Sequence, residues 1–189
     1  MMRGTSTVRI WRVQALSKNN LYFAYGSNLN QQDLEEWRKE NPEYADVDLK
    51  FNKVTNAYLP AFRLGFTRKS KMARRQYMGV ADVVSSDDPL SRVWGVIFSL
   101  TVEQDKAIEA KEGAPASYRS ILAKVIDVEG KSHDCMTYQA VVPDNKRKSL
   151  YFRPSQEYYE VIRKGGEDHG LPREFFYHLR MVSEASWVV

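Results

Sequence analysis

The sequence is poor in the residues on which disulfide bonds and metal sites depend. It holds one cysteine, Cys135, and three histidines, His133, His169 and His178. A single cysteine excludes a disulfide within one chain and favours a reducing compartment, so we expect a cytoplasmic protein. These four residues do not have the spacing of a metal-ligand cluster. We therefore expect no metal site.

Long hydrophobic runs and nucleotide motifs are missing as well. No apolar run approaches the roughly 18 residues that span a membrane, and there is neither a Gly-Lys-Ser/Thr P-loop nor a Gly-x-Gly-x-x-Gly fingerprint. The net charge is only +4, and the basic segments lack interleaved aromatic residues, so we expect no nucleic-acid partner. The 189 residues, 43% of them hydrophobic, suit one globular domain.

Residues 1–20 form a basic extension, because no acidic residue occurs before Asp33. Such a segment is compatible with a targeting sequence or a flexible tail, and residues 8–13 could instead add an edge strand. We therefore divide the chain into this extension and a single domain over residues 21–189.

The most informative stretch runs from Tyr22 to Leu29 and reads YFAYGSNL. Residues 21–25 are apolar and aromatic, as in a buried strand, and Gly26-Ser27-Asn28 favours a turn. Helix-forming residues follow from position 31, with Asn28 or Asn30 placed to cap them. Backbone N–H groups at such a junction, together with the helix dipole, favour a bound carboxylate or oxyanion. The alternative is a tight connection without a ligand.

The rest of the chain alternates strand and helix patterns. Six further strands are expected at 54–58, 62–67, 79–84, 92–100, 118–128 and 133–142. A basic run from Arg63 to Arg75 predicts a solvated hairpin loop, with an acidic substrate or a nucleic acid as the functional alternatives, and Lys146-Arg147-Lys148 predicts a loop. A helix begins at Pro154 and is expected to end at Gly165-Gly166, and a last helix follows Pro172. Seven strands with few helices between them favour a closed barrel with helices outside.

Glu112 is a candidate acid–base residue. Thr101 and Gln104 form a capping box that starts a helix, and Gly113 is typical of its end. Glu112 therefore lies in the last turn, where the negative end of the helix dipole should raise the pKa of its carboxyl group. A raised pKa suits a glutamate that acts as both base and acid near neutral pH. The alternative is an exposed glutamate at a frayed helix end.

The stretch from Tyr22 to Leu29 resembles the signature of the γ-glutamylcyclotransferase family, and later features match that family in the same order. Val93-Trp94-Gly95-Val96 resembles its Val-Trp-Gly-Val strand, and Glu112-Gly113 falls at its catalytic Glu-Gly. The remaining matches, within residues 21–180, are Tyr118 at the start of a strand, Thr137-Tyr138 in a pocket strand, Pro154-Ser155 with Tyr158 in a helix, and Gly170-Leu171-Pro172.

The resemblance implies an α+β fold, a mixed β-barrel flanked by α-helices, and an enzyme without a cofactor. In the family's reaction the free α-amine of a γ-glutamyl group attacks its own γ-carbonyl. This step closes the 5-oxoproline ring and expels an amino acid or an amine. One carboxylate that moves a proton from the attacking nitrogen to the leaving nitrogen suffices, and the resemblance assigns this role to Glu112.

The resemblance also implies the residues that bind the substrate. The backbone N–H groups from Tyr25 to Asn28 would hold either the α-carboxylate or the developing oxyanion, and Ala140 would add a backbone contact. Tyr118 and Tyr158 have either a pocket role or a core role. The full set is Glu112 as the catalytic residue, with Tyr22, Phe23, Ala24, Tyr25, Gly26, Ser27, Asn28, Tyr138 and Ala140 around the substrate.

The sequence departs from the family pattern at Gln76-Tyr77-Met78-Gly79, where the family has a tryptophan and two glycines. The departing half of the substrate is therefore open: an α-amino acid, the ε-amine of lysine or another amine. The expected partner is a small γ-glutamyl compound. The alternative function is a non-catalytic protein that binds an acidic small ligand. A homodimer also stays open, because the apolar residues 187–189 could pack on a second copy.

Overall fold

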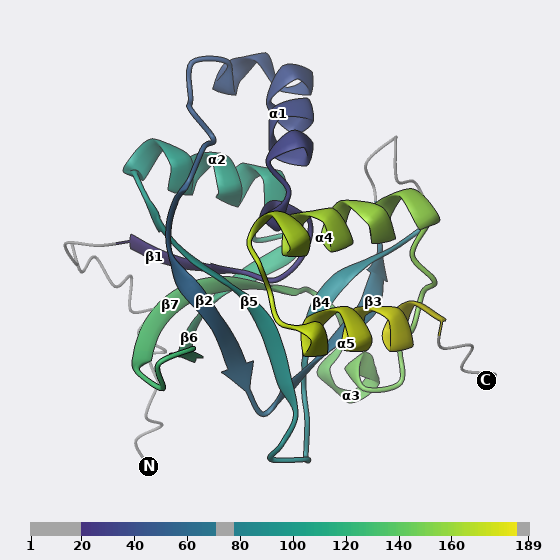
Figure 1. Ribbon diagram of the computed structural model, residues 1–189. Coiled ribbons are helices and arrows are strands. Elements are labelled where there is room, and N and C mark those ends of the chain that lie inside the picture. Colours follow the sequence, from purple (N-terminus) through teal and green to yellow (C-terminus); the bar gives the residue numbers. More distant parts are fainter. Residues whose placement is uncertain (1–19, 71–77, 185–189) are drawn as a thin grey trace, which may run out of the picture.

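A closed five-stranded barrel forms the centre of the computed structural model, which describes residues 20–70 and 78–184 (Figure 1). Around the barrel the strands are β1 (Asn20–Ala24), β5 (Arg92–Leu100), β2 (Asn52–Pro60), β6 (Tyr118–Asp127) and β7 (Ser132–Ala140). β7 and β1 close the barrel as a parallel pair, and the other neighbours are antiparallel. The expected mixed barrel flanked by helices is confirmed.

The expectation that all seven strands join one barrel is wrong for two of them. β3 (Phe62–Lys69) and β4 (Gly79–Ser85) form a separate two-stranded sheet. β4 is buried along all but its last residue because it packs against the barrel by side chains rather than by strand pairing. The amide of Gln139 on β7 donates a 2.9 Å hydrogen bond to the carbonyl of Val83. This contact joins the hairpin to the barrel.

Two pairs of helices cover the barrel (Figure 1). Figure 1 shows α1 (Gln31–Glu40) and α2 (Val102–Glu112) beyond one end, and α4 (Gln156–Asp168) beside α5 (Arg173–Glu184) on a flank. Of the two candidate caps, Asn28 and Asn30, it is Asn30 that caps α1, and both hydrogen bonds of the predicted capping box at α2 are present. Short helices complete the fold: η1 (Ser27–Leu29), η2 (Pro42–Tyr44) and α3 (Asp144–Arg147). Within the described ranges, no helix is long and apolar enough to cross a membrane.

The prediction that Gly165-Gly166 ends a helix is wrong, because α4 continues through both residues to Asp168. Each glycine instead allows a close contact. A Cβ atom on Gly165 would lie 2.7 Å from the backbone of Leu29, and one on Gly166 would lie 2.3 Å from the ring of Phe175. The pair therefore lets α4 approach η1 on one side and α5 on the other.

One buried core joins the barrel, the hairpin and the helices. Gly95 of β5 is needed there, because a Cβ atom would lie 2.2 Å from the carbonyl oxygen of Ala24 on β1. The glycine brings β5 and β1 close together beside the turn that follows β1. Some expectations lie outside the described residues. They concern the edge strand and the rest of residues 1–19, the part of the basic run and of the unusual Gln76–Gly79 stretch that falls within residues 71–77, and the apolar residues 187–189.

Candidate active site

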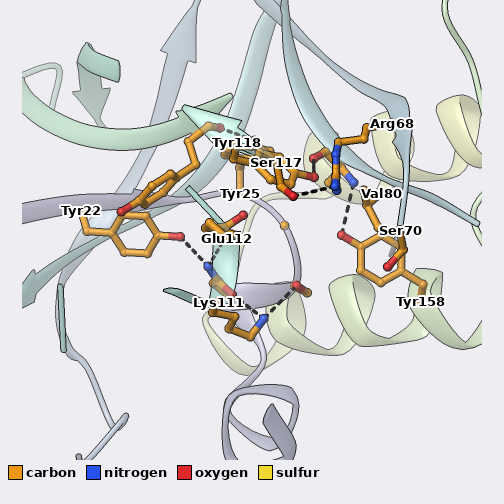
Figure 2. Close-up of a pocket in the computed structure, with 16 residues that line it drawn as sticks. Tyr22, Tyr25, Arg68, Ser70, Val80, Lys111, Glu112, Ser117, Tyr118 and Tyr158 are labelled. Carbon is orange, nitrogen blue, oxygen red and sulfur yellow. Dashed lines mark hydrogen bonds between the residues drawn. The ribbon is translucent and has the colours of Figure 1, made fainter. Parts of the chain in front are cut away.

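A cavity of about 270 Å³ lies where β1 ends. Its walls come from the turn after β1, the last turn of α2, the hairpin β3–β4, and single residues of β7 and α4 (Figure 2). Among the described residues, the tyrosines that line it are Tyr22, Tyr25, Tyr118, Tyr138 and Tyr158. The charged residues that line it, within the same described part of the chain, are Arg68, Lys111 and Glu112. Aromatic walls with few charged groups are typical of a site for a small polar ligand.

The turn after β1 lines this cavity, and some of its backbone donors have no partner among the described residues. Leu29 N–H donates to the carbonyl of Gly26 at 3.1 Å, and Asn30 N–H donates to Ser27 at 3.0 Å. Among the described residues, the backbone N–H groups of Gly26, Ser27 and Asn28 donate no hydrogen bond. These three groups are therefore available to a ligand. Successive N–H groups in a turn bind anionic oxygen atoms well.

Asn28 connects the turn to Glu112. Its side-chain nitrogen donates to Glu112 Oε1 at 2.7 Å and to the hydroxyl oxygen of Tyr22 at 2.8 Å (Figure 2). Glu112 is half-buried and is the last residue of α2, and Gly113 follows it in the left-handed conformation. The structure therefore places this carboxylate on the cavity wall with a defined partner, which contradicts the alternative of a frayed exposed end.

Lys111 is a buried cation behind the turn. Its Nζ atom donates to Asn28 Oδ1 at 2.8 Å and forms an ion pair with Asp33 Oδ2 at 3.1 Å. The two charged side chains are only 4% and 1% exposed, so water screens them little. Because Lys111 occupies the oxygen of the Asn28 amide, the nitrogen of that amide must face Glu112 and Tyr22.

The tyrosines of the cavity are neutral hydrogen-bonding groups. Burial is the largest cause that raises the pKa of Tyr22, Tyr25 and Tyr118 well above its usual value, and burial also raises the pKa of Tyr138. Tyr25 donates to the carbonyl of Tyr138 at 2.6 Å, and Tyr118 donates to that of Ala81 at 2.8 Å. The phenols therefore keep their protons near neutral pH.

A buried ion pair supports the wall from behind. Arg147 donates from Nη1 to Asp82 Oδ2 at 2.7 Å, and the backbone N–H of Ala140 donates to Asp82 Oδ1 at 2.8 Å. Burial raises the pKa of Asp82, while hydrogen bonds from Thr67 and Ala140 and the charge of Arg147 act against it. The predicted loop at Lys146-Arg147-Lys148 is thus wrong for Lys146 and Arg147, which lie in α3, and Arg147 is also buried.

The chain resembles known proteins both in sequence and in structure. The pattern of the AIG2-like family matches residues 92–179. The γ-glutamylcyclotransferase of Mus musculus is 30% identical over 164 residues, which cover 86% of this chain and 78% of that protein. The chain belongs to the γ-glutamylcyclotransferase family. The enzyme of that name from Bos taurus is 31% identical over 157 residues, covering 82% of this chain and 74% of that protein.

A solved γ-glutamyl cyclotransferase structure shares the fold. It is 26% identical to this chain, with a TM-score of 0.65, and the match covers 89% of this chain and 90% of that one. The likeness therefore extends over most of both chains.

Most residues that the γ-glutamylcyclotransferase resemblance implied come together in the cavity. The residues that line it are Tyr22, Tyr25, Gly26, Ser27, Asn28, Glu112 and Tyr138. Three others do not, and those expectations are corrected. Phe23 and Ala24 are fully buried in the core of the barrel, because β1 is covered on both faces. The N–H group of Ala140 is already bonded to Asp82.

Other lining residues had no signal of their own in the sequence. Lys111 and Ser117 stand near Glu112 in the chain, and Arg68 was one member of a long basic run. Tyr118 and Tyr158, for which pocket and core roles were both open, line the cavity and are buried as well. The order of the motifs indicated the Tyr118 and Tyr158 positions, but nothing local indicated Arg68.

Proposed function

We propose that this chain is a γ-glutamyl cyclotransferase that releases 5-oxoproline and a free amino acid or amine, with Glu112 as the single acid–base residue. The observation that carries the proposal is the hydrogen bond between Asn28 and Glu112. It holds a carboxylate beside a turn that lines the same cavity. An anion-binding turn and a proton acceptor thus lie within reach of one small substrate.

The turn binds and bends the substrate. The N–H groups of Gly26, Ser27 and Asn28 hold an anionic oxygen of the γ-glutamyl group, which is its α-carboxylate or the oxyanion that develops on the γ-carbonyl. Ring closure requires the α-amine and the γ-carbonyl carbon to be in contact, and a binding site contributes by holding that bent conformer. The tyrosine rings form the walls around it.

Glu112 moves two protons, one after the other. Its carboxylate takes a proton from the α-ammonium group, and the free amine then attacks the γ-carbonyl carbon and forms the new C–N bond. Glu112 gives this proton to the departing nitrogen, and the tetrahedral intermediate expels the amine as the old C–N bond breaks. The carboxylate then takes the second proton from the new ring nitrogen and passes it to the freed amine, which leaves as an ammonium ion, so Glu112 ends in its initial state.

Other cavity groups are poorly suited to this role. The phenols of Tyr22, Tyr25, Tyr118 and Tyr138 hold their protons because burial raises each pKa. Lys111 is engaged in an ion pair with Asp33. Glu112 is therefore the proton acceptor that the geometry favours.

The first test compares the native protein with Glu112→Gln on a panel of γ-glutamyl compounds, with 5-oxoproline measured by mass spectrometry. We expect product from the native protein and a loss of about 10²- to 10⁴-fold in the variant, the usual range for removal of a general acid–base group. Glu109→Gln is the matched control, because Glu109 is an exposed residue of the same helix. It should keep full activity.

Two results would contradict the proposal. Equal activity of the native protein and Glu112→Gln would exclude Glu112 as the acid–base residue. A folded native protein that forms no 5-oxoproline from any compound, but is stabilised against heat by one of them, would favour the alternative of a non-catalytic binding protein.

A further inference from the structure

Lys111 lines the cavity, but its ammonium group is already engaged by the protein. The Nζ atom donates to Asn28 Oδ1 at 2.8 Å, to Asp33 Oδ2 at 3.1 Å and to Ser27 Oγ at 3.4 Å. An ammonium group has three N–H donors and no acceptor, so these three contacts can use all of them. Lys111 is therefore suited to hold neighbouring side chains in place rather than to bind a substrate.

The charges of Lys111 and Asp33 suit the helix ends on which they lie. Asp33 is in the first turn of α1, where the helix dipole is positive, and Lys111 is in the last turn of α2, where it is negative. The ion pair joins these two helix ends across 78 positions of sequence, and the two side chains are only 4% and 1% exposed. A buried pair of this kind fixes the position of the lysine beside the η1 turn.

Lys111 decides which end of the Asn28 amide faces Glu112. Because an ammonium group only donates, it requires the amide oxygen, and the amide nitrogen then donates to Glu112 Oε1 at 2.7 Å (Figure 2). The reverse orientation would place N–H groups against Lys111 and an oxygen atom against Glu112. That orientation suits only a protonated Glu112, which is unable to act as the base.

We propose that Lys111 is a positioning residue for the reaction, which locks the Asn28 amide in the orientation that binds the Glu112 carboxylate, while Asp33 holds the lysine in place. The inference rests on the proposed function, because that function makes Glu112 the acid–base residue. Asp33 does not line the cavity, so it acts on the site through Lys111.

Each member of the pair should affect the ionisation of Glu112 with a definite sign. Loss of the Lys111 cation disfavours the ionised carboxylate and should raise the pKa of Glu112, whereas loss of the Asp33 anion should lower it. On α2 itself, Asp105 and Glu109 do not line the cavity. A guanidinium group and buried phenols keep their protons near neutral pH, so they do not mask the two shifts. Among the described residues, the other titratable groups of the lining are Arg68, Tyr22, Tyr25, Tyr118, Tyr138 and Tyr158.

The test measures kcat/KM for 5-oxoproline formation as a function of pH. Lys111→Met should lower kcat/KM by about 10- to 100-fold near neutral pH, the range for a displaced catalytic group, and should move the acidic limb to higher pH. Asp33→Asn should move the limb to lower pH, because an amide oxygen still accepts from Lys111. Lys111→Arg keeps the charge and the donors, so it should return the limb toward its native position.

A second variant covers the risk that Lys111→Met destabilises the fold by leaving the buried Asp33 carboxylate without its lysine. Lys111→Met/Asp33→Asn removes both charges, so only the loss of orientation remains, and its acidic limb should still lie above that of the native protein. Lys106→Met is the matched control, because Lys106 is an exposed cation of the same helix. It should leave the profile unchanged.

The ionisation of Glu112 also has a readout that needs no turnover. Carbon-13 NMR of the glutamate carboxyl carbons, with the Glu112 signal identified by its loss in Glu112→Gln, reports its titration in the folded protein without substrate. Opposite shifts in Lys111→Met and Asp33→Asn support the positioning role even if no 5-oxoproline forms, a result that would contradict only the proposed reaction. A Glu112 signal that titrates at the same pH in the native protein, in Lys111→Met and in the double variant would overturn the positioning role.

Discussion

Asn28 uses both ends of one side-chain amide. Its oxygen accepts from Lys111 at 2.8 Å, and its nitrogen donates to Glu112 at 2.7 Å and to Tyr22 at 2.8 Å. The residue is 4% exposed, so these contacts replace water almost completely. A buried amide with all its partners present is rigid, because any rotation would leave polar groups unpaired. Asn28 therefore fixes the position of the Glu112 carboxylate.

Asn28→Asp tests this role. An aspartate keeps the acceptor for Lys111 but places an oxygen atom against Glu112, and two adjacent carboxylates raise the pKa of one another. We expect kcat/KM to fall by about 10²-fold or more and its acidic limb to move to higher pH. The measurement is a pH profile of 5-oxoproline formation. An unshifted limb would show that the two side chains do not interact in the active form.

At the scale of elements, helix α4 sets the position of the turn. Its N-terminus is capped by Ser155, and its two glycines let it contact η1 and α5 closely. Asn30 also donates to the carbonyl of Val161 in α4 at 3.0 Å. The glycines in this helix cost some helical stability relative to alanine, and close packing offsets that cost. The contact explains how a helix distant in sequence affects the active-site turn.

Gly165→Ala should reverse the usual effect of this substitution. In an exposed helix an alanine stabilises by about 1 kcal/mol, but here its Cβ atom would lie 2.7 Å from the Leu29 backbone. We expect destabilisation of about 1–3 kcal/mol and reduced turnover, because the turn must shift. Urea unfolding and kinetics measure both. Lys164→Ala, at an exposed neighbour, is the control, and a Gly165→Ala protein as stable and active as it would contradict the argument.

At the scale of the whole molecule, the barrel and the β3–β4 hairpin share one core. Leu64 and Phe66 of the hairpin belong to the same buried cluster as Phe23 and Ile97 of the barrel. The cavity lies between these two parts, with Arg68 on one and Tyr22 on the other. The geometry of the cavity thus depends on how the hairpin packs against the barrel. The single domain over residues 21–189 stays a prediction, which an unfolding experiment can test.

Leu64→Ala removes buried methyl groups from the hairpin side of that core. We expect a loss of about 2–5 kcal/mol in one transition that far-UV circular dichroism and tryptophan fluorescence report at the same urea concentration. Leu90→Ala, at a residue that is 82% exposed, should change little. A separate early transition in Leu64→Ala would show that the hairpin unfolds alone, and would contradict the single domain.

The sequence by itself determined the local features of this protein. The capping box of α2, the cap at Asn30, the turn after β1 and the position of Glu112 at a helix end all follow from residues within a few positions of one another. These capping and turn interactions join groups that are close in sequence, so they form largely independently of the rest of the fold. The fold class also followed from the order of strands and helices, and from the family resemblance. The raised pKa of Glu112 stays a prediction.

Only the tertiary structure decided which charges are paired and which glycines are packed. Lys111 and Asp33 are 78 positions apart, and Arg147 and Asp82 are 65 apart. Two consecutive glycines are typical of a helix end, but Gly165 and Gly166 instead allow close packing inside α4. In the sequence Arg68 was one basic residue among several, and only the structure places it at the cavity. These roles depend on which surfaces meet, and the free energy of such contacts comes from burial and close approach between segments that no local pattern records.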